Sequence, residues 1–178
     1  MIAKLAAYWL DENSLVYIYS YLKRREQCVK INNTYSKFQL ILSGVPQGSV
    51  LGPILFNFFI SDLILFVKKA SVYNYADDDT LVHSSKTMSD LIDVLESEAI
   101  ISLEWLKNND MIANPEKFHA FLIREDQSDT SGVNISIQGK RIKSEDSVKL
   151  FGIKLDNKLN FDSNISDLCH KLQLSLMS

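Results

Sequence analysis

The chain has 178 residues, 46% of them hydrophobic, and a formal net charge of −3. That length is enough for one good core, and the apolar fraction is ordinary for a globular protein, so wholesale disorder is excluded. The acidic balance provides no global positive field that would attract nucleic acid. The two cysteines, Cys28 and Cys169, have neither metal-ligand spacing nor a disulfide pattern, which is compatible with a reducing compartment.

No segment predicts secretion or membrane insertion. The N-terminus lacks the pattern of a signal peptide, because Lys4 and then Tyr8-Trp9 interrupt its short apolar run. The most apolar stretch, residues 50–67, contains Pro53 and Asp62, and a carboxylate is costly in a lone membrane span. We therefore expect a core helix there, no membrane association, and an intracellular protein in the cytoplasm, the nucleus or both.

Helical and strand patterns alternate through the first half of the chain. In order, the sequence predicts a helix capped by Asn13 or Ser14 that runs to about Arg25, two strands at 27–31 and 37–42 joined across Asn32-Asn33, a glycine-rich loop at 43–48, and a long apolar helix at about 49–67. Pro53 falls in the first turn of that helix, where proline is tolerated because the N–H groups lack partners.

The second half begins with an acidic hairpin and continues with the clearest amphipathic helix. This helix starts near Thr87, ends at Asn108-Asn109-Asp110, and carries an apolar stripe of Leu91, Leu95, Ala99, Leu103 and Leu106. We then expect strands at 118–123, 134–138 and 148–155, a polar loop at 125–132, and a helical tail at 164–176. This order predicts an α+β fold with an antiparallel sheet and helices packed on one face.

The most informative motif is the tetrad Tyr75-Ala76-Asp77-Asp78. It lies between two short apolar runs and predicts a β-hairpin whose tight turn brings two carboxylates together. Adjacent carboxylates repel each other unless a cation lies between them, and Mg²⁺ prefers such hard oxygen ligands. The alternative is an ordinary polar turn, because aspartate is a common turn residue.

A glycine-rich phrase, Gly44-Val45-Pro46-Gln47-Gly48-Ser49-Val50-Leu51-Gly52-Pro53, precedes the tetrad by about twenty-five residues. A glycine loop that enters a helix presents free backbone N–H groups and the positive end of the helix dipole, which suits a phosphate or a closely approaching nucleic-acid strand. Taken by itself, the phrase is equally compatible with a simple helix start.

In this order and spacing, the motifs resemble those of the reverse transcriptases of non-LTR retrotransposons. The glycine phrase through Phe56 resembles the family's template- and nucleotide-binding loop, and the tetrad resembles its catalytic hairpin. Two further segments are similar to the family's lysine segment and to its primer-grip hairpin: Ala113-Asn114-Pro115-Glu116-Lys117-Phe118, and Leu150-Phe151-Gly152-Ile153 with Leu155-Asp156. The resemblance implies a right-hand palm, with residues 1–157 as a partial palm and 158–178 as the start of the thumb.

The resemblance also implies roles for individual residues. Asp77 and Asp78 would be catalytic and would hold Mg²⁺ or Mn²⁺, and Lys117 would stand beside the departing pyrophosphate unless it is only a solvated turn lysine. The implied nucleotide- and template-binding residues are Pro46, Gln47, Gly48, Tyr75 and Ala76, and the implied primer grip is Phe151 and Gly152. Tyr75 is alternatively a core residue, and Gly152 an ordinary bulge.

The implied activity is RNA-directed DNA polymerisation: two-metal nucleotidyl transfer onto a primer 3′-hydroxyl, with an RNA template, a DNA primer and dNTPs as partners. The family has another aspartate on a palm strand upstream of the glycine loop, and Met1 to Leu5 resemble the residues that follow it. The fingers, the first palm strand and that aspartate are thus expected to be missing. We therefore expect an inactive polymerase fragment with an exposed sheet edge, or alternatively a non-catalytic remnant that binds nucleic acid or protein.

Overall fold

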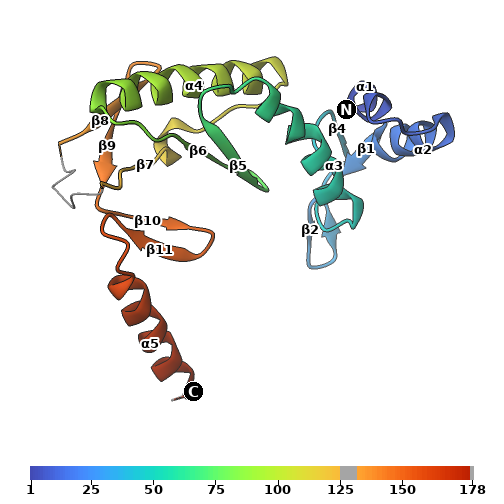
Figure 1. Ribbon diagram of the computed structural model, residues 1–178. Helices are drawn as coiled ribbons and strands as arrows, with labels where there is room; N and C mark the ends of the chain where they lie inside the picture. The colour runs from blue at the N-terminus through green and yellow to red at the C-terminus, as the bar shows by residue number, and fades with distance from the viewer. Residues whose placement is uncertain (125–131, 177–178) are drawn as a thin grey trace. The chain divides into compact units, whose positions relative to one another are not determined.

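The computed structural model describes residues 1–124 and 132–176, and the contacts divide the chain into two compact units, Met1–Leu63 and Ile64–Ser178 (Figure 1). The predicted loop at 125–131 lies outside the described residues. Every helix among the described residues is too short or too polar to cross a membrane.

The first unit packs small helices and two small antiparallel sheets. Its elements are α1 (Ile2–Ala7), α2 (Glu12–Leu22), β1 (Arg25–Gln27), β2 (Lys30–Ile31), β3 (Thr34–Tyr35), β4 (Gln39–Ile41) and α3 (Leu51–Ile60), and the 3-10 helix η1 (Ser61–Leu65) runs across its boundary. Strand β1 pairs with β4, and β2 pairs with β3 inside that ribbon, so the predicted turn at Asn32-Asn33 is confirmed.

Three helix boundaries in this unit differ from the sequence predictions. Helix α2 is capped by Asp11, whose carboxylate accepts a hydrogen bond from Ser14 N at 3.1 Å, and it ends at Leu22. The apolar helix predicted to reach residue 67 ends at Ile60 and tightens into η1. There Lys4 Nζ lies 2.7 Å from Asp62 Oδ1 and donates to the Phe59 carbonyl at 2.9 Å, which fixes this end of α3 to α1.

The second unit is arranged around one long helix. Its elements are β5 (Ser71–Tyr75), β6 (Asp78–Val82), α4 (Met88–Asn108), the 3-10 turn η2 (Pro115–Lys117), β7 (Ala120–Phe121), β8 (Asn134–Ile137), β9 (Lys140–Glu145), β10 (Ser147–Leu150), β11 (Ile153–Asp156) and α5 (Asp162–Leu176). Helix α4 begins and ends where the sequence predicts, with the Thr87 side chain accepting from Asp90 N. It contacts β6 and β8 (Figure 1).

The α+β prediction is confirmed, but the sheets differ from the single antiparallel sheet that we expected. The described residues form five small sheets: four two-stranded ribbons and the three-stranded sheet β7-β9-β8. In the last of these, β7 runs parallel to β9. Strand β9 was not predicted, and the strand expected at 148–155 is two strands, β10 and β11. The β5-β6 ribbon has no third strand in the described residues, so both of its outer edges are unpaired there.

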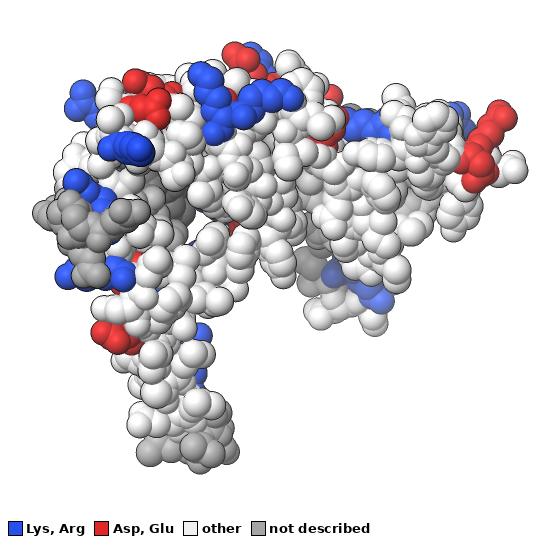
Figure 2. Space-filling model, in the orientation of Figure 1, with Lys and Arg blue, Asp and Glu red and all other residues white. Residues whose placement is uncertain are grey.

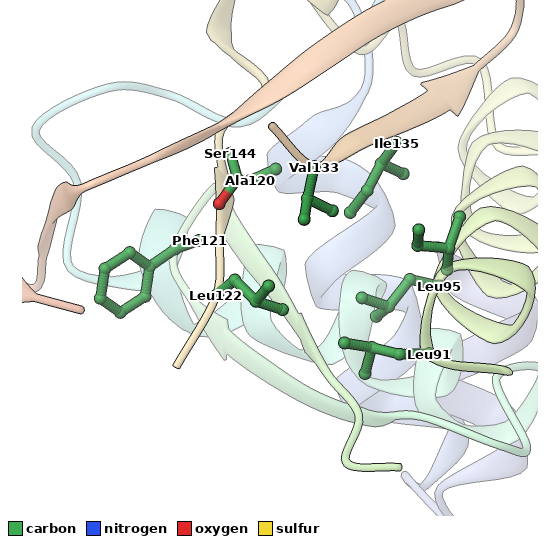
Figure 3. A pocket seen from close by; sticks show the side chains of 9 residues that line it. Leu91, Leu95, Ala120, Phe121, Leu122, Val133, Ile135 and Ser144 are labelled. Atoms are coloured by element: carbon green, nitrogen blue, oxygen red, sulfur yellow. The ribbon is translucent and has the colours of Figure 1, made fainter. Parts of the chain in front are cut away.

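The core of the second unit lies between α4 and the inner face of the three-stranded sheet. Side chains from α4, β7, β8 and the segments beside them meet around a small apolar pocket (Figure 3). Leu91 and Leu95 face Leu122 and Ile135 across it, whereas Phe121 points away. The hydroxyl of Ser144 is buried at this pocket without a hydrogen-bond partner in the described residues.

A buried carboxylate ties α4 to the segment that precedes the acidic hairpin. Glu98 is only 2% exposed, and its Oε2 accepts a hydrogen bond from the backbone N–H of Lys68 at 2.8 Å. Burying a polar group without a hydrogen-bond partner is destabilising, so this bond offsets part of the cost of placing Glu98 on the buried face of the helix.

We expect Glu98→Ala to lower the free energy of unfolding by about 1–3 kcal/mol, because it leaves the Lys68 N–H without its acceptor and opens a cavity. Glu98→Gln keeps an acceptor oxygen and should cost less. Urea unfolding followed by circular dichroism measures both variants. Equal losses for the two would show that the hydrogen bond does not matter.

Candidate active site

The acidic tetrad forms the predicted hairpin. Strands β5 and β6 pair in antiparallel register with Tyr75 opposite Asp78, which leaves Ala76 and Asp77 as the two turn residues. Asp77 and Asp78 are both exposed at this tip. Ala76 has a φ of +53°, a left-handed conformation that is uncommon for a residue with a side chain. The tip therefore carries local backbone strain together with two carboxylates.

A third carboxylate, Asp79, follows on the same strand but lies on its other face. Successive side chains of a strand alternate, so Asp78 shares a face with Tyr75, and Asp79 shares the opposite face with its register partner Asn74. The Asn74 Nδ2 amide donates a hydrogen bond to Asp79 Oδ1. Asp79 is exposed by surface area, but the protein atoms around its carboxylate partly desolvate it and raise its pKa; the Asn74 hydrogen bond opposes this rise, and the charges of Asp78 and Asp77 add to it.

The glycine-rich loop is folded back onto the start of α3. Ser49 Oγ donates to the Pro46 carbonyl at 2.7 Å and accepts from Gly52 N at 3.0 Å, so one hydroxyl joins the loop to the helix. Gly48 has a φ of +78°, which a residue with a side chain rarely adopts. A Cβ on Gly52 would lie 2.9 Å from Ser49 Oγ and 3.0 Å from the Pro46 carbonyl oxygen. Glycine at position 52 is therefore what allows the loop to approach so closely.

The lysine segment forms the short turn η2. Asn114 caps it by accepting from Glu116 N at 3.1 Å, and Pro115 occupies its first position. Lys117 is exposed, and among the described residues its ammonium makes no hydrogen bond or ion pair. The side chain is thus available to an anion.

The second hairpin is confirmed as a hairpin and reaches the first one. Leu150 pairs with Ile153, so Phe151 and Gly152 are the two turn residues, with φ values of +50° and +85° that match a type I′ turn. Gly152 is therefore a turn residue rather than a bulge. The rings of Tyr75 and Phe151 pack with their centroids 5.1 Å apart at an interplanar angle of 53°. Both rings remain largely exposed, so Tyr75 is not a core residue.

The structure therefore brings together one pair of predicted site residues, Tyr75 and Phe151, and with them the tips of two hairpins. Lys117 belongs to the same unit, but in the described part of the chain no hydrogen bond or ion pair joins it to the acidic turn. Pro46, Gln47 and Gly48 belong to the first unit. Their roles and those of the other site residues stay predictions.

The acidic tip supplies some, but not all, of the ligands that a divalent cation needs. Asp77 and Asp78 supply hard oxygen ligands from adjacent positions, and Mg²⁺ completes its coordination with waters and phosphate oxygens. Within residues 1–124 and 132–176, no group of three or more acidic, histidine or cysteine side chains is arranged to hold a metal. The tip thus offers two carboxylates, and a tightly held ion would need oxygen ligands from elsewhere.

Sequence reasoning missed two residues that support this region. Glu98 occupies the buried face of α4, four positions after the buried Val94, and a carboxylate in an apolar stripe was a visible signal. Lys140 contacts the lysine turn from β9, and nothing in its neighbourhood along the sequence indicates this.

On the face shown in Figure 2, lysine and arginine side chains occur in separate groups among acidic ones rather than in one continuous basic area.

The order of glycine loop, acidic hairpin, lysine turn and second hairpin is the order of motifs in a polymerase palm, and comparison with known families agrees with this class. The pattern of the family "Reverse transcriptase (RNA-dependent DNA polymerase)" matches residues 2–155, and the chain belongs to this family. The resemblance to the reverse transcriptases of non-LTR retrotransposons is thereby confirmed for a partial domain.

The curated relatives are polymerases of mobile elements. The chain is 31% identical over 155 residues to the probable RNA-directed DNA polymerase from transposon BS of Drosophila melanogaster, covering 82% of this chain and 17% of that protein. It is also 31% identical over 156 residues to the RNA-directed DNA polymerase from mobile element jockey of the same species, covering 84% of this chain and 17% of that protein. The chain thus spans about a sixth of these relatives, and no solved structure matches it.

We expect Gly52→Ala to destabilise the first unit by about 1–3 kcal/mol, because the new methyl group meets the Pro46 carbonyl and forces the loop away from the helix. Gly132→Ala is the matched control, since a Cβ there meets nothing within 4 Å. Urea unfolding compares the two variants. A Gly52→Ala chain as stable as the control would contradict the close approach.

We expect Asp79→Asn to stabilise the chain at pH 7. The folded-state pKa of Asp79 is raised above 3.8, so the folded chain binds this proton more tightly than the unfolded chain, and ionisation costs stability as the pH rises through that range. The gain should therefore shrink as the pH falls towards 3.8. Urea unfolding at several pH values measures it, and a gain that is independent of pH would show that the raised pKa is not its cause. Asn74→Ala, which removes the amide donor, should lower stability at pH 7.

Proposed function

We propose that this chain is the rear part of the palm of an RNA-directed DNA polymerase, which extends a DNA primer on an RNA template by nucleotidyl transfer from dNTPs. In this proposal, residues 1–157 belong to the palm and 158–178 begin the thumb, and the polymerase acts inside the cell. The observation that carries the proposal is the exposed Asp77-Asp78 tip packed through Tyr75 against the Phe151 turn, in a chain of this family.

The acidic tip would hold the metal. Asp77 is the principal ligand and Asp78 its neighbour, with Mg²⁺ or Mn²⁺ as the ion. When bound, the two metal ions of such a site activate the primer hydroxyl and stabilise the leaving oxygen. The hairpin places Asp77 in its turn and Asp78 at the first position of β6, both exposed, and the Asn74 amide holds the Asp79 carboxylate on the opposite face from Asp78.

The remaining residues position the reactants. Lys117 presents an ammonium that makes no hydrogen bond or ion pair within residues 1–124 and 132–176, and it would neutralise negative charge on the departing pyrophosphate. Pro46, Gln47 and Gly48 would line the nucleotide and template pocket, where the positive φ of Gly48 turns the backbone close to its ligand. Tyr75 and Ala76 would lie against the nucleotide and the primer end, and Phe151 with Gly152 would grip the primer.

The isolated chain is proposed to be inactive. Two-metal transfer needs carboxylates from more than one strand, and the described residues offer the Asp77-Asp78 pair without a third ligand grouped beside it. The same observation favours a second candidate function, in which the chain keeps the palm fold and only binds nucleic acid or protein.

We expect the isolated chain to give no extension of a DNA oligonucleotide primer annealed to an RNA template in the presence of dNTPs and Mg²⁺. A chimera that joins the upstream polymerase region of the jockey relative ahead of residue 2 should extend the primer, because we propose that this region supplies a further carboxylate from another strand. In that chimera, Asp77→Asn should reduce the rate by about a thousandfold or more, since it removes charge at the metal.

Asp11→Asn is the control carboxylate in this assay, because Asp11 caps helix α2 and has no role in the site. Extension of the primer by the isolated chain would overturn the proposal that this chain is inactive by itself. An Asp77→Asn chimera with full activity would overturn the catalytic assignment of Asp77. A chimera that binds primer and template without extending the primer would support the binding function.

A further inference from the structure

Lys140 makes two contacts with the lysine turn from a distant point in the sequence. Its Nζ donates to the Pro115 carbonyl at 2.9 Å and lies 2.8 Å from Glu116 Oε1. Lys140 is the first residue of β9 and follows a turn in which Gln138 and Gly139 both have positive φ. This backbone turn fixes the position at which β9 begins. It therefore also fixes the backbone of Lys140, whose side chain extends to η2.

The turn has few bonds of its own. Lys117 N donates to the Asn114 carbonyl at 3.0 Å, and Phe118 N donates to the Pro115 carbonyl at 3.3 Å. Short 3-10 segments have poor hydrogen-bond geometry and little intrinsic stability. The Lys140 ammonium adds a charge-assisted bond to the same Pro115 carbonyl, so it anchors the turn from outside.

The ion pair also changes the electrostatics at Lys117. Glu116 is the neighbour of Lys117 in sequence, and its side chain, although 83% exposed, lies 2.8 Å from the Lys140 ammonium. An unpaired carboxylate at that position would attract the Lys117 ammonium and lower the positive potential that an anion meets there. With Lys140 beside it, the Glu116 charge is compensated, so less of the positive potential around Lys117 is offset.

We propose that Lys140 is a positioning residue for Lys117: it anchors the η2 turn through the Pro115 carbonyl and neutralises Glu116, which leaves the Lys117 ammonium free to meet the phosphate oxygens of an incoming nucleotide. The identity of that ligand rests on the proposed function. The anchoring and the neutralisation do not, because both are properties of the chain itself.

The test compares three variants of the full chain. Lys140→Met removes the charge and the donor, Lys140→Arg keeps both, and Lys143→Met removes an exposed cation from the same strand that makes no hydrogen bond or ion pair in the described residues. Amide hydrogen exchange of Lys117 and Phe118 reports on the turn. We expect exchange to be several-fold faster in Lys140→Met and unchanged in the other two.

The second measurement isolates the neutralisation. Acetylation of Lys117 by a limiting amount of acetic anhydride, followed by mass spectrometry, should be about two- to fivefold slower in Lys140→Met, because the released Glu116 stabilises the protonated amine. Adding Glu116→Gln to Lys140→Met should restore the rate. A turn that is merely loosened would not respond to this second substitution.

An unchanged acetylation rate in Lys140→Met, or a failure of Glu116→Gln to restore it, would overturn the neutralisation. Unchanged amide exchange would overturn the anchoring. Neither measurement involves polymerase activity, so a negative result in the primer-extension assay leaves both outcomes interpretable. If the two hold and Lys117→Ala still does not slow extension by the active chimera, the proposed role of Lys117 fails while the structural contact stands.

Discussion

The burial of one face of helix α4 is the constraint on which the second unit depends. The helix contacts strand β6 of the acidic hairpin and strand β8 of the three-stranded sheet, and its buried residues include Val94, Glu98, Ala99 and Trp105. Through Glu98 it also holds the backbone at Lys68, three residues before β5 begins. Because a two-stranded ribbon has little stability of its own, the hairpin with its carboxylates takes its support from this helix.

The way the hairpin distributes its charges follows from strand geometry. Three consecutive aspartates would repel one another strongly if their carboxylates pointed to one place. The two-residue turn and the alternation of the strand separate them instead: Asp77 occupies the turn, Asp78 lies on the Tyr75 face, and Asp79 turns to the other face and meets Asn74. The Asp79 carboxylate is thus held away from the pair that is proposed to bind metal.

Local patterns predicted those parts of the molecule whose causes are local. The Thr87 cap and the apolar spacing determined α4, and the acidic tetrad marked a tight turn. The turn at Phe151-Gly152 followed only from the family resemblance, because the residue pattern by itself predicted one strand at 148–155. Strand β9 was missed because its outward residues, Arg141 and Lys143, are charged and only two inward positions, Ile142 and Ser144, are buried. The Lys140 contacts with Pro115 and Glu116 span about twenty-five positions, and no local rule reports a contact at that separation.

The two tryptophans give the chain a built-in optical distinction between its units. Trp9, in the first unit, is 94% exposed, whereas Trp105, on α4 in the second, is 4% exposed. Indole emission shifts to longer wavelength in water, so the native spectrum combines one red-emitting and one blue-emitting fluorophore. Loss of the blue component then reports the opening of the α4 core, while iodide, which quenches exposed indoles, acts on Trp9. Each half of this molecule can therefore be followed separately without attaching a label.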